Sequence, residues 1–449
     1  MHTDERALLA DADRRALTYY DSIEHRRVYP LESAIAALDG FDHPLPTAGS
    51  PAQQVLHKLD QLGTPATVTS NGPRYFGFVI GATLPAAAAA ERMVLAWDQC
   101  ASSFDNSPVA DKLEKVAARW VCEALGLPTE SAVGFGTSAT ACTLACLSAA
   151  RRQLLAKQGW DFDQDGLIGA PEIRVVISET GHITVKKALR VLGFGMRRLQ
   201  LAPVDEHGRI DPARLPELDD RTLLILQAGE VNTGEFDRFA ELIPRVRAAG
   251  AWVHVDGAFG LWARASSSAG LADGIEQADS WTTDGHKWLN TPYDSAMAIC
   301  RDGDALAAAM NSDAAYAMAS KEAQKNLTLE FSRRARGVAI WAALASLGRD
   351  GLRDMIDRHI CQAGYLAEAL RGGGYQVLNR VRLNQVLVRG DSDEQTAAIL
   401  NAAQGSGETW FGATVWQGRP AFRLSVSSWR TTDADIEALI TLLLRLKNA

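Results

Sequence analysis

Basic runs and long apolar stretches are both missing from this chain of 449 residues. The formal net charge is -8 and the lysines and arginines are dispersed, so no field attracts a phosphate backbone and a nucleic-acid partner is not expected. No window holds about 18 uninterrupted apolar residues, the length of a membrane-spanning helix. The best candidate, LPAAAAAERMVLAW, is broken by Glu91 and Arg92, so we expect no membrane partner.

Paired cysteines and a secretory leader are also lacking. The six cysteines are spread along the chain, and only Cys142 and Cys146 lie close, at a spacing that puts two small apolar side chains on one helix face. No CxxC or Cys/His set suggests zinc, so we predict reduced, buried thiols and no metal. The start, MHTDERALLADADRR, is polar and charged, which favours a cytoplasmic protein.

Residues 1–65 form the first of three regions. Helical periodicity is followed by a proline-rich break, DHPLPTAGSP, and the segment has no evident core of its own. We therefore expect this helical segment to pack on something else, such as a partner subunit at a dimer interface.

Residues 66–345 alternate strand-like runs with amphipathic helices. The runs IRVVISE, TLLILQAG, WVHVDGAFG and SAMAICR are short and β-rich, and helical stretches such as HITVKKALRVLG lie between several of them. The alternation predicts a large α/β domain whose central sheet is mostly parallel, with helices on both faces.

Residues 346–449 have a different pattern. LNQVLVRG, ETWFGATVW and AFRLSVSSW predict antiparallel strands, and Thr432 with Asp435 predicts an N-cap pair that opens the last helix. This region is expected to be a small α+β C-terminal domain.

Two polar side chains stand out in the large region. Asp256 ends the strand WVHVD, and ligands of open α/β sheets bind at the carboxyl ends of strands. Lys287 lies beyond the next strand-like segment, among apolar and aromatic neighbours, where an amine is a competent nucleophile toward a carbonyl. A carboxylate and a lysine in this order suggest a cofactor held as a Schiff base, with its pyridinium nitrogen paired to Asp256.

Four motifs extend this interpretation: GHITVKKALRVLG, WVHVDGAFG, DGHKWLN and PYDSAM. Together they resemble the group II pyridoxal-5'-phosphate (PLP) decarboxylases, which include aromatic amino acid and glutamate decarboxylases, and the segment WDFDQDGLIGAP resembles bacterial members. The similarity runs from RYFGFVIG to AFRLSVSSWRTTD. The resemblance implies PLP fold type I (aspartate aminotransferase-like), a homodimer with active sites at the subunit interface, and decarboxylation of an L-amino acid to the amine and CO2.

The resemblance also implies roles for single residues. Lys287 would form the Schiff base, Asp256 would keep the pyridine nitrogen protonated, His182 would stack on the ring and serve in proton transfer, and Ala258 would press on the opposite face. GTSATACTL matches the phosphate loop, where a helix N-terminus favours an anion. Each residue also has an alternative role without a cofactor: His182 as a helix-entry histidine, Asp256 as a strand-end cap, and GTSAT as an ordinary N-cap. The positions assigned to phosphate are Ser138, Ala139, Thr140 and His286.

Three residues are candidate substrate contacts. Phe76 and Phe104 suit an aromatic pocket, although core packing explains aromatic side chains equally well. Arg423 matches an arginine that meets a substrate carboxylate in glutamate decarboxylases, and a salt bridge across the small domain is its alternative. The identity of the amino acid stays open.

Two departures from the family pattern lie near the expected cofactor. Asp284 replaces an asparagine near the phosphate, and because a carboxylate there would repel the phosphate, we expect its side chain to be turned elsewhere. Glu230 and Val231 replace a pair of threonines, so Glu230 is either a site residue or a strand-end charge.

A third departure concerns the reaction outcome. Family members carry a loop tyrosine that protonates the substrate carbon after CO2 leaves, and here Tyr316 is the only one in the loop ahead of Arg333. Either Tyr316 reaches over, or another tyrosine acts, or the product differs, since loss of that phenol is associated with aldehyde formation. The rivals are thus an aldehyde-forming enzyme or other PLP lyase, and a non-catalytic PLP-binding protein.

The stretch from Asp161 to Glu172 fits a calcium loop, D-x-D-x-D-G-x5-E. An EF-hand needs a helix on both sides, and IRVVISE directly after Glu172 predicts a strand. Pro171 also fits poorly beside a metal ligand, so we expect an ordinary loop here.

Overall fold

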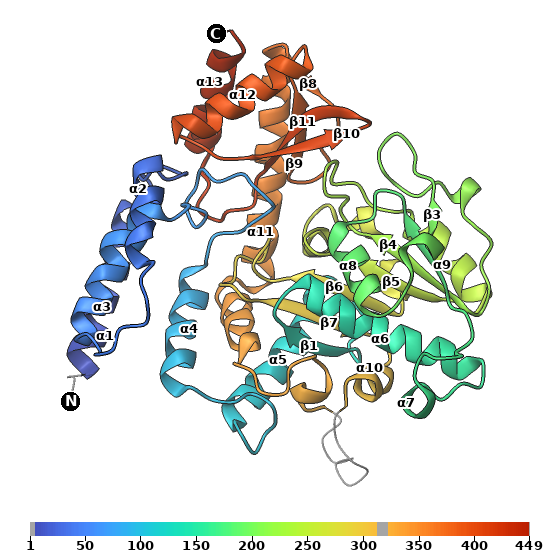
Figure 1. Cartoon of the computed structure of the whole chain (residues 1–449). Coiled ribbons are helices and arrows are strands. Elements are labelled where there is room, and N and C mark those ends of the chain that lie inside the picture. Colours follow the sequence, from blue (N-terminus) through green and yellow to red (C-terminus); the bar gives the residue numbers. More distant parts are fainter. Residues whose placement is uncertain (1–4, 312–321, 449) are drawn as a thin grey trace.

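The computed structural model describes residues 5–311 and 322–448, which form three parts (Figure 1). A helical arm from the N-terminus, drawn in blue, stands at one side. A large sheet covered by helices fills the centre, and a small sheet with the C-terminus lies above it in this view.

The large sheet has seven strands in the described part of the chain, in the order β1-β7-β6-β5-β4-β2-β3. Strands β2 to β6 run parallel, whereas β7 is antiparallel to both β6 and β1. The mostly parallel sheet is confirmed, with SAMAICR as the strand that runs the other way. The strands are β1 (Ala132–Gly136), β2 (Arg174–Ser178), β3 (Gln200–Ala202), β4 (Thr222–Gln227), β5 (Trp252–Asp256), β6 (Ser280–Asp284) and β7 (Ala296–Cys300).

Helices cover both faces of this sheet, as predicted, because each strand presents apolar side chains alternately to its two sides. Val175 and Ile177 of β2 pack in the core formed with α6, α8 and α10, whereas Val176 between them belongs to the core formed with α5, α9 and α11. No helix among the described residues combines the length and apolar composition needed to cross a membrane. The helices are α4 (Pro85–Trp97), α5 (Pro108–Leu125), α6 (Ala139–Lys157), α8 (Ile183–Val191), α9 (Phe239–Ala248), α10 (Gly303–Met310) and α11 (Arg336–Gly372).

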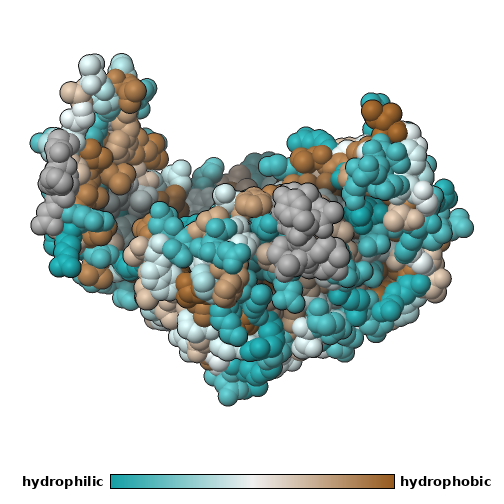
Figure 2. Space-filling model, turned by 90° about the horizontal axis from the view of Figure 1, so that it is seen from below, coloured by the Kyte–Doolittle hydropathy of each residue, from teal (hydrophilic) through white to brown (hydrophobic). Residues whose placement is uncertain are grey.

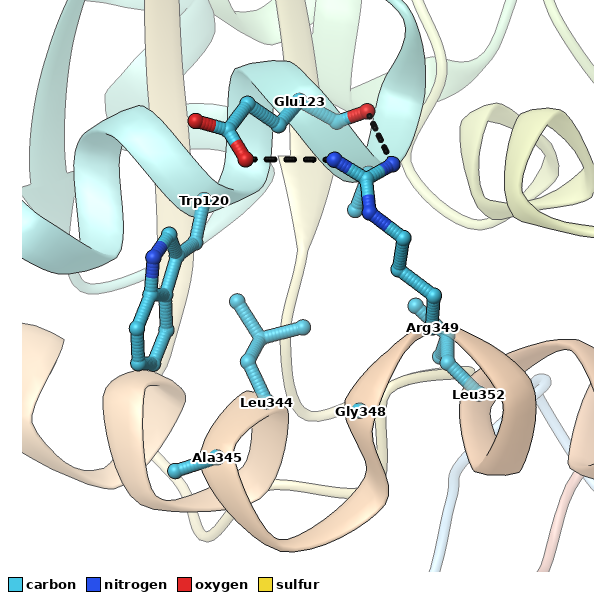
Figure 3. Close-up of a pocket in the computed structure, with 8 residues that line it drawn as sticks. Trp120, Glu123, Leu344, Ala345, Gly348, Arg349 and Leu352 are labelled. Atoms are coloured by element: carbon cyan, nitrogen blue, oxygen red, sulfur yellow. Dashed lines mark hydrogen bonds and ion pairs between the residues drawn. The ribbon is translucent and has the colours of Figure 1, made fainter.

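The long helix α11 joins the large and small parts. Its backbone bends at Gly348, where φ is 63° and ψ is -173°, a conformation that glycine adopts without a steric penalty. Figure 3 shows the pocket at this bend, where Trp120 lies near Leu344 and the side chains of Glu123 and Arg349 form an ion pair at 3.1 Å. The boundary expected at 345/346 falls just before the bend, and the domain limits stay a prediction.

The small part contains the predicted antiparallel strands, in the order β10-β11-β9-β8. Thr432 and Asp435 form the predicted capping box at the start of α13. Phe76, from the beginning of the large region, packs here against the core that holds Phe411 and Phe422. The elements are β8 (Gln376–Val377), β9 (Gln385–Arg389), α12 (Asp393–Ser406), β10 (Gly412–Trp416), β11 (Arg419–Ser425) and α13 (Asp433–Lys447).

The arm contributes little to these cores. Its helices α1 (Glu5–Ser22), α2 (Glu32–Ala36) and α3 (Ala52–Lys58) contain no buried residue. The segment after α1 joins the small part, where the Val28 N–H donates to the Gly407 carbonyl at 2.8 Å. The segment after α1 is also held by the buried side chains of Ile23 and Val28, and α1 contacts α4 through the Arg92–Asp13 ion pair at 2.9 Å.

All six cysteines are unpaired, as predicted, but they are not all buried. Cys361 is exposed and Cys100 is half-buried, so the expectation of buried thiols is wrong at these two positions. Cys361 lies on the solvent side of α11, which the sequence spacing alone did not reveal. The buried thiols are Cys122, Cys142, Cys146 and Cys300.

Candidate active site

The polar ends of several elements meet at one edge of the large sheet. Asp256 ends β5, Asp284 ends β6, His182 caps α8 and Ser138 caps α6. Because the carboxyl ends of parallel strands lie together, these side chains surround one cavity. It is lined by Ser138, Ala139, Thr140, His182, Thr184, Gln227, Gly229, Val231, Asp256, Ala258, Phe259, Asp284, His286 and Lys287. The structure thus brings together all eight residues that the sequence assigned to the cofactor.

The start of α6 forms one wall of the cavity. Ser138 has an extended backbone and its Oγ accepts the Ala141 N–H at 3.3 Å, so it is the N-cap. The Ala139 N–H donates to Oδ1 of Asp284 at 2.7 Å. The expectation that Asp284 turns away from this loop is therefore wrong, because the positive end of the helix attracts its carboxylate.

Lys287 lies next to this carboxylate. Its Nζ is 3.6 Å from Oδ2 of Asp284 and 5.9 Å from the centre of the Phe259 ring. Its neighbours are thus aromatic, as expected, but also acidic. The preceding residue is held by the Gly81 N–H, which donates to the His286 carbonyl at 3.1 Å. The lysine backbone is therefore packed against the segment around residue 81.

Asp256 and His182 line the same cavity. Oδ1 of Asp256 accepts the Ala258 N–H at 3.2 Å, so the carboxylate is oriented by its own strand end. Nδ1 of His182 accepts the Thr184 N–H at 3.4 Å and lies 2.7 Å from the Thr184 hydroxyl. Burial lowers the pKa of His182, with the negative charge of Asp256 opposing the shift. The neutral ring therefore carries its hydrogen on Nε2. His182 is a helix-entry histidine and a cavity residue at once.

His286 is fixed from behind. Its Nδ1 donates to the Ser295 carbonyl at 2.8 Å, and its ring stacks on Tyr293 with centroids 4.2 Å apart. Burial lowers the pKa of His286, so the imidazole is neutral at pH 7 and Nε2 is an acceptor. That nitrogen lies 3.7 Å from Oδ2 of Asp284.

The loop after β4 supplies Val231 to the cavity wall. Glu230 is buried and its carboxylate accepts the backbone N–H groups of Asn232 and Thr233, each at 2.7 Å. Burial raises the pKa of Glu230, and these hydrogen bonds oppose that shift. Arg423 donates to the Val231 carbonyl at 3.0 Å and forms no salt bridge within the described residues. Glu230 thus shapes its own loop, and Arg423 supports it from the small part.

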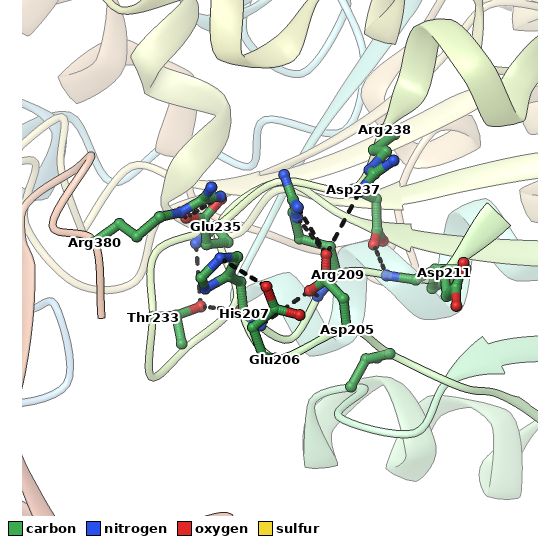
Figure 4. Close-up of polar contacts among 12 residues, drawn as sticks. Asp205, Glu206, His207, Arg209, Asp211, Thr233, Glu235, Asp237, Arg238 and Arg380 are labelled. Carbon is green, nitrogen blue, oxygen red and sulfur yellow. Dashed lines mark hydrogen bonds and ion pairs between the residues drawn. The ribbon is translucent and has the colours of Figure 1, made fainter. Parts of the chain in front are cut away.

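The same loop is tied to two further segments (Figure 4). Asp237 accepts the Ile210 and Gln227 N–H groups, each at 2.7 Å, and burial raises its pKa to about 7. Arg380 of the small part donates to Glu235 at 2.7 Å. The loop that carries Val231 is therefore held by hydrogen bonds from both the large and the small parts of the molecule.

Two predicted residues, Phe76 and Phe104, lie apart from the cavity. Phe76 is 1% exposed and packs in the core of the small part, which is the alternative that the sequence left open. Phe104 is 59% exposed and is not part of the lining. Tyr316 lies outside the described residues. The substrate roles of Phe76, Phe104 and Arg423 and the catalytic role of Tyr316 stay predictions.

Four lining residues were missed by the sequence analysis: Thr184, Gln227, Gly229 and Phe259. Gln227 ends β4 and Gly229 lies two positions beyond it, so the strand-end rule that selected Asp256 would have found them. Thr184 had no distinguishing signal beyond its place two residues after His182.

The acidic side chains of the calcium-loop-like stretch, Asp161 to Glu172, contact protein groups. Asp161 caps the short helix α7 (Phe162–Asp165), and Asp163 pairs with Arg152 at 2.6 Å. Glu172 lies 3.4 Å from Arg198. The acidic side chains therefore face different partners, and no acidic, histidine or cysteine cluster suited to a metal is found within the described ranges.

The geometry agrees with a family match. Residues 36–387 match the profile described as the pyridoxal-dependent decarboxylase conserved domain. The chain belongs to the pyridoxal-dependent decarboxylase family. It is a PLP-dependent carboxy-lyase that acts on an L-amino acid.

Named relatives and solved structures resemble this decarboxylase over most of their length. "Tryptophan decarboxylase 1" of Oryza sativa subsp. japonica is 26% identical over 470 residues, covering 95% of this chain and 90% of that protein. "Phenylacetaldehyde synthase" of Arabidopsis thaliana is 23% identical over 457 residues, covering 93% and 91%. The crystal structure of Oryza sativa TDC with PLP and tryptamine superposes with a TM-score of 0.90 at 23% identity, covering 99% and 98%. The fold is PLP fold type I.

The cavity of the decarboxylase suits PLP by its own chemistry. It offers an amine for an aldehyde at Lys287, a carboxylate for a pyridine nitrogen at Asp256, and the hydroxyl-rich N-terminus of α6 for a phosphate. The neutral ring of His182 lies at the same cavity. At the start of α6, the carboxylate of Asp284 opposes a phosphate by its charge.

Proposed function

We propose that this cavity is the active site and that Lys287 is the amine that holds the cofactor. The observation that carries the proposal is that Lys287, Asp256, His182 and the start of α6 line one cavity. PLP, when bound, supplies an electron sink for the pair left at Cα as CO2 departs. The amine and CO2 are the products under this proposal.

The chain's own residues have distinct tasks in the proposal. Asp256 accepts a hydrogen bond from a protonated pyridine nitrogen and stabilises its positive charge. His182 holds a proton on Nε2 and, with Ala258, bounds the space for a flat ring. Ser138, Ala139 and Thr140 bind the phosphate, and His286 binds it once a proton on Nε2 makes that nitrogen a donor.

Borohydride reduction tests the cofactor assignment. The purified protein should carry a reduced pyridoxyl group on Lys287, located by peptide mass spectrometry. Lys287→Ala should carry none, and a pyridoxyl group on another residue of that variant would overturn the assignment. Release of CO2 across the twenty amino acids tests the reaction and identifies the substrate, and release from none of them would favour the non-catalytic rival.

Aldehyde formation is a second candidate outcome of the reaction, and the name of one relative favours it. A relative covering most of this chain is named phenylacetaldehyde synthase, and Tyr316 is the one tyrosine of the loop ahead of Arg333. Product analysis separates the two: amine with CO2 supports the main proposal, whereas aldehyde, ammonia and peroxide support the alternative. If Tyr316 protonates the substrate carbon, Tyr316→Phe should shift the products toward the aldehyde.

We also infer that a second copy of the chain covers the N-terminal arm. Figure 2 shows hydrophobic side chains on the arm, which stands apart from the body across a hollow. Such a contiguous exposed apolar surface is typical of an interface. The exposed apolar side chains of the arm include Leu9, Leu17, Leu31, Val55 and Leu59.

Light scattering tests the homodimer. The wild-type protein should have twice the mass of the 48.4 kDa chain. Leu17→Glu combined with Val55→Glu should shift it toward the monomer, whereas Ile168→Glu, a change at a 94% exposed site away from the arm, should not. A monomeric wild type would contradict the inference.

A cytoplasmic location completes the proposal. It is supported by six unpaired cysteines, since exposed and half-buried thiols such as Cys361 and Cys100 persist in reducing compartments. Cell fractionation that recovers the native protein outside the cytoplasm would contradict it.

A further inference from the structure

The carboxylate of Asp284 lies between three groups that the proposed function assigns to the cofactor. Oδ1 accepts the Ala139 N–H at 2.7 Å, and Oδ2 is 3.6 Å from the Lys287 amine and 3.7 Å from Nε2 of His286. The residue is 3% exposed. A negative charge is therefore held inside the proposed phosphate site.

The backbone of Asp284 holds this position. Its N–H donates to the Ala258 carbonyl at 2.9 Å, and its carbonyl accepts the indole N–H of Trp262 at 3.0 Å. The residue also pairs with Ala296 in the register between β6 and β7. Contacts with three separate elements thus fix the backbone of Asp284 and present its side chain to the start of α6.

The donors at the start of α6 are already shared. The Ala139 N–H is bound by Asp284, and the Ala141 N–H is bound by the Ser138 hydroxyl. A phosphate at this helix terminus meets a carboxylate that uses the same positive end. Like charges that share one helix terminus repel, and the repulsion is stronger in a buried site than in water.

We propose that Asp284 sets the affinity for the phosphorylated cofactor, weakening the hold on its phosphate and thereby reducing the preference for PLP over unphosphorylated pyridoxal. The inference rests on the proposed function, because it places the phosphate at α6 and the aldehyde at Lys287. Asparagine at this position offers the same acceptor oxygen to the Ala139 N–H without the charge. Asp284→Asn therefore removes the repulsion and keeps the hydrogen bond.

The experiment compares two ligands on two variants of the full-length protein. Equilibrium dialysis gives the dissociation constants of PLP and pyridoxal for the wild type, for Asp284→Asn and for the control Asp302→Asn. Asp302 caps α10 by accepting the Ala305 N–H, and asparagine caps a helix equally well. The control removes the same charge at the opposite edge of the sheet.

Asp284→Asn should bind PLP at least tenfold more tightly than the wild type, with the constant for pyridoxal changed less than twofold. The control should match the wild type for both ligands. Inorganic phosphate should also compete with PLP at least tenfold more effectively in Asp284→Asn, which probes the anion site without the aldehyde. Weaker PLP binding by Asp284→Asn, or an equal gain for both ligands, would overturn the proposal.

Borohydride labelling in the same samples separates this inference from the function on which it rests. If PLP labels Lys287 but the affinities do not differ as described, only the role of Asp284 fails. If neither ligand labels Lys287 in any sample, the proposed site itself fails.

Discussion

The indole N–H of Trp288 donates to Nδ1 of His359, 3.0 Å away, although the two residues lie 71 positions apart in the chain. The other ring nitrogen of His359 donates to the Ser428 carbonyl at 3.0 Å. The residue next to Lys287 is thereby joined through α11 to the small part of the molecule. The hydrogen bond from Trp288 requires the neutral form of the imidazole, because a protonated Nδ1 cannot accept a hydrogen bond.

This arrangement predicts acid sensitivity. Burial lowers the pKa of His359 to about 3, so the unfolded chain binds a proton near its ordinary pKa of 6.5 whereas the folded protein resists it. Stability conferred by the neutral ring is therefore present above pH 6.5 and is lost as the pH falls toward 3. His359→Gln keeps a donor and an acceptor without titrating, so its free energy of unfolding should fall less on acidification, by about 1.4 kcal/mol per pH unit.

Thermal unfolding at pH 7, 6 and 5 measures this difference. His254 shows the same shift, to a pKa of about 3 through burial, and should contribute a similar slope. The exposed His25, changed to Gln, is the control and should leave the slope as it is in the wild type. Equal slopes for His359→Gln and the wild type would refute the assignment.

Asp256→Asn should retain the cofactor but lose activity. Asparagine has the same size but does not carry the charge that stabilises a protonated pyridine nitrogen, so CO2 release should fall roughly 10²–10³-fold, the range seen for loss of one electrostatic group. Borohydride labelling of Lys287 should persist. Full activity in this variant would exclude a catalytic role for the carboxylate.

Glu114 of α5 and Arg333 form an ion pair whose side chains are wholly buried. Burial raises the pKa of Glu114, with Arg333 opposing the shift, and the carboxylate also accepts the Gly337 N–H at 2.9 Å. Glu114→Ala should destabilise the protein by about 3–5 kcal/mol, because it leaves the guanidinium buried and unpaired.

Glu123→Ala is the matched control for that pair. Glu123 contacts Arg349 at the surface, where such pairs contribute about 0–1 kcal/mol. Calorimetry should therefore show a large fall in Tm for Glu114→Ala and a small one for Glu123→Ala. Similar Tm values for the two variants would contradict the burial argument.

Gly81 is expected to tolerate no side chain. A Cβ at this position would lie 2.0 Å from the Lys287 carbonyl oxygen, and a backbone atom cannot move aside easily. Gly81→Ala should therefore lower Tm and reduce borohydride labelling of Lys287. Gly364→Ala, in the middle of α11 with open space around it, should instead stabilise the protein by roughly 0.5–1 kcal/mol. Unchanged labelling in Gly81→Ala would show that this contact does not position the lysine.

Much of the fold followed from local pattern. The strand WVHVD and the capping box of Thr432 and Asp435 depend on neighbours within a few residues, and both were predicted. The strands β1 and β3 were not predicted, because AVGFG and QLA are short. The strand-like segment expected ahead of Lys287 is β6, whose polar side chains are buried through pairing with distant strands. The direction of β7 was likewise invisible in its composition.

The site divides in the same way. The residue types and order of Asp256 and Lys287 were sufficient to suggest the cofactor chemistry, because a strand end can be identified from neighbouring residues, and the role of His182 was implied by the family resemblance. The orientation of Asp284 could not be predicted from the sequence, since it depends on a helix terminus 145 residues away. The prediction that Asp284 turns away considered only the repulsion between its carboxylate and a phosphate. It did not include the attraction between the carboxylate and the N-terminus of α6.

The sequence by itself determined the α/β architecture and the family resemblance, because these depend on periodicity and on the residues of short motifs, and the resemblance implied which residues would hold PLP. Only the tertiary structure decided that Phe76 is a core residue of the small part, that Asp284 faces the start of α6, and that Trp288 pairs with His359. Burial and side-chain direction are set by partners far along the chain, and no local pattern encodes which partner will be near.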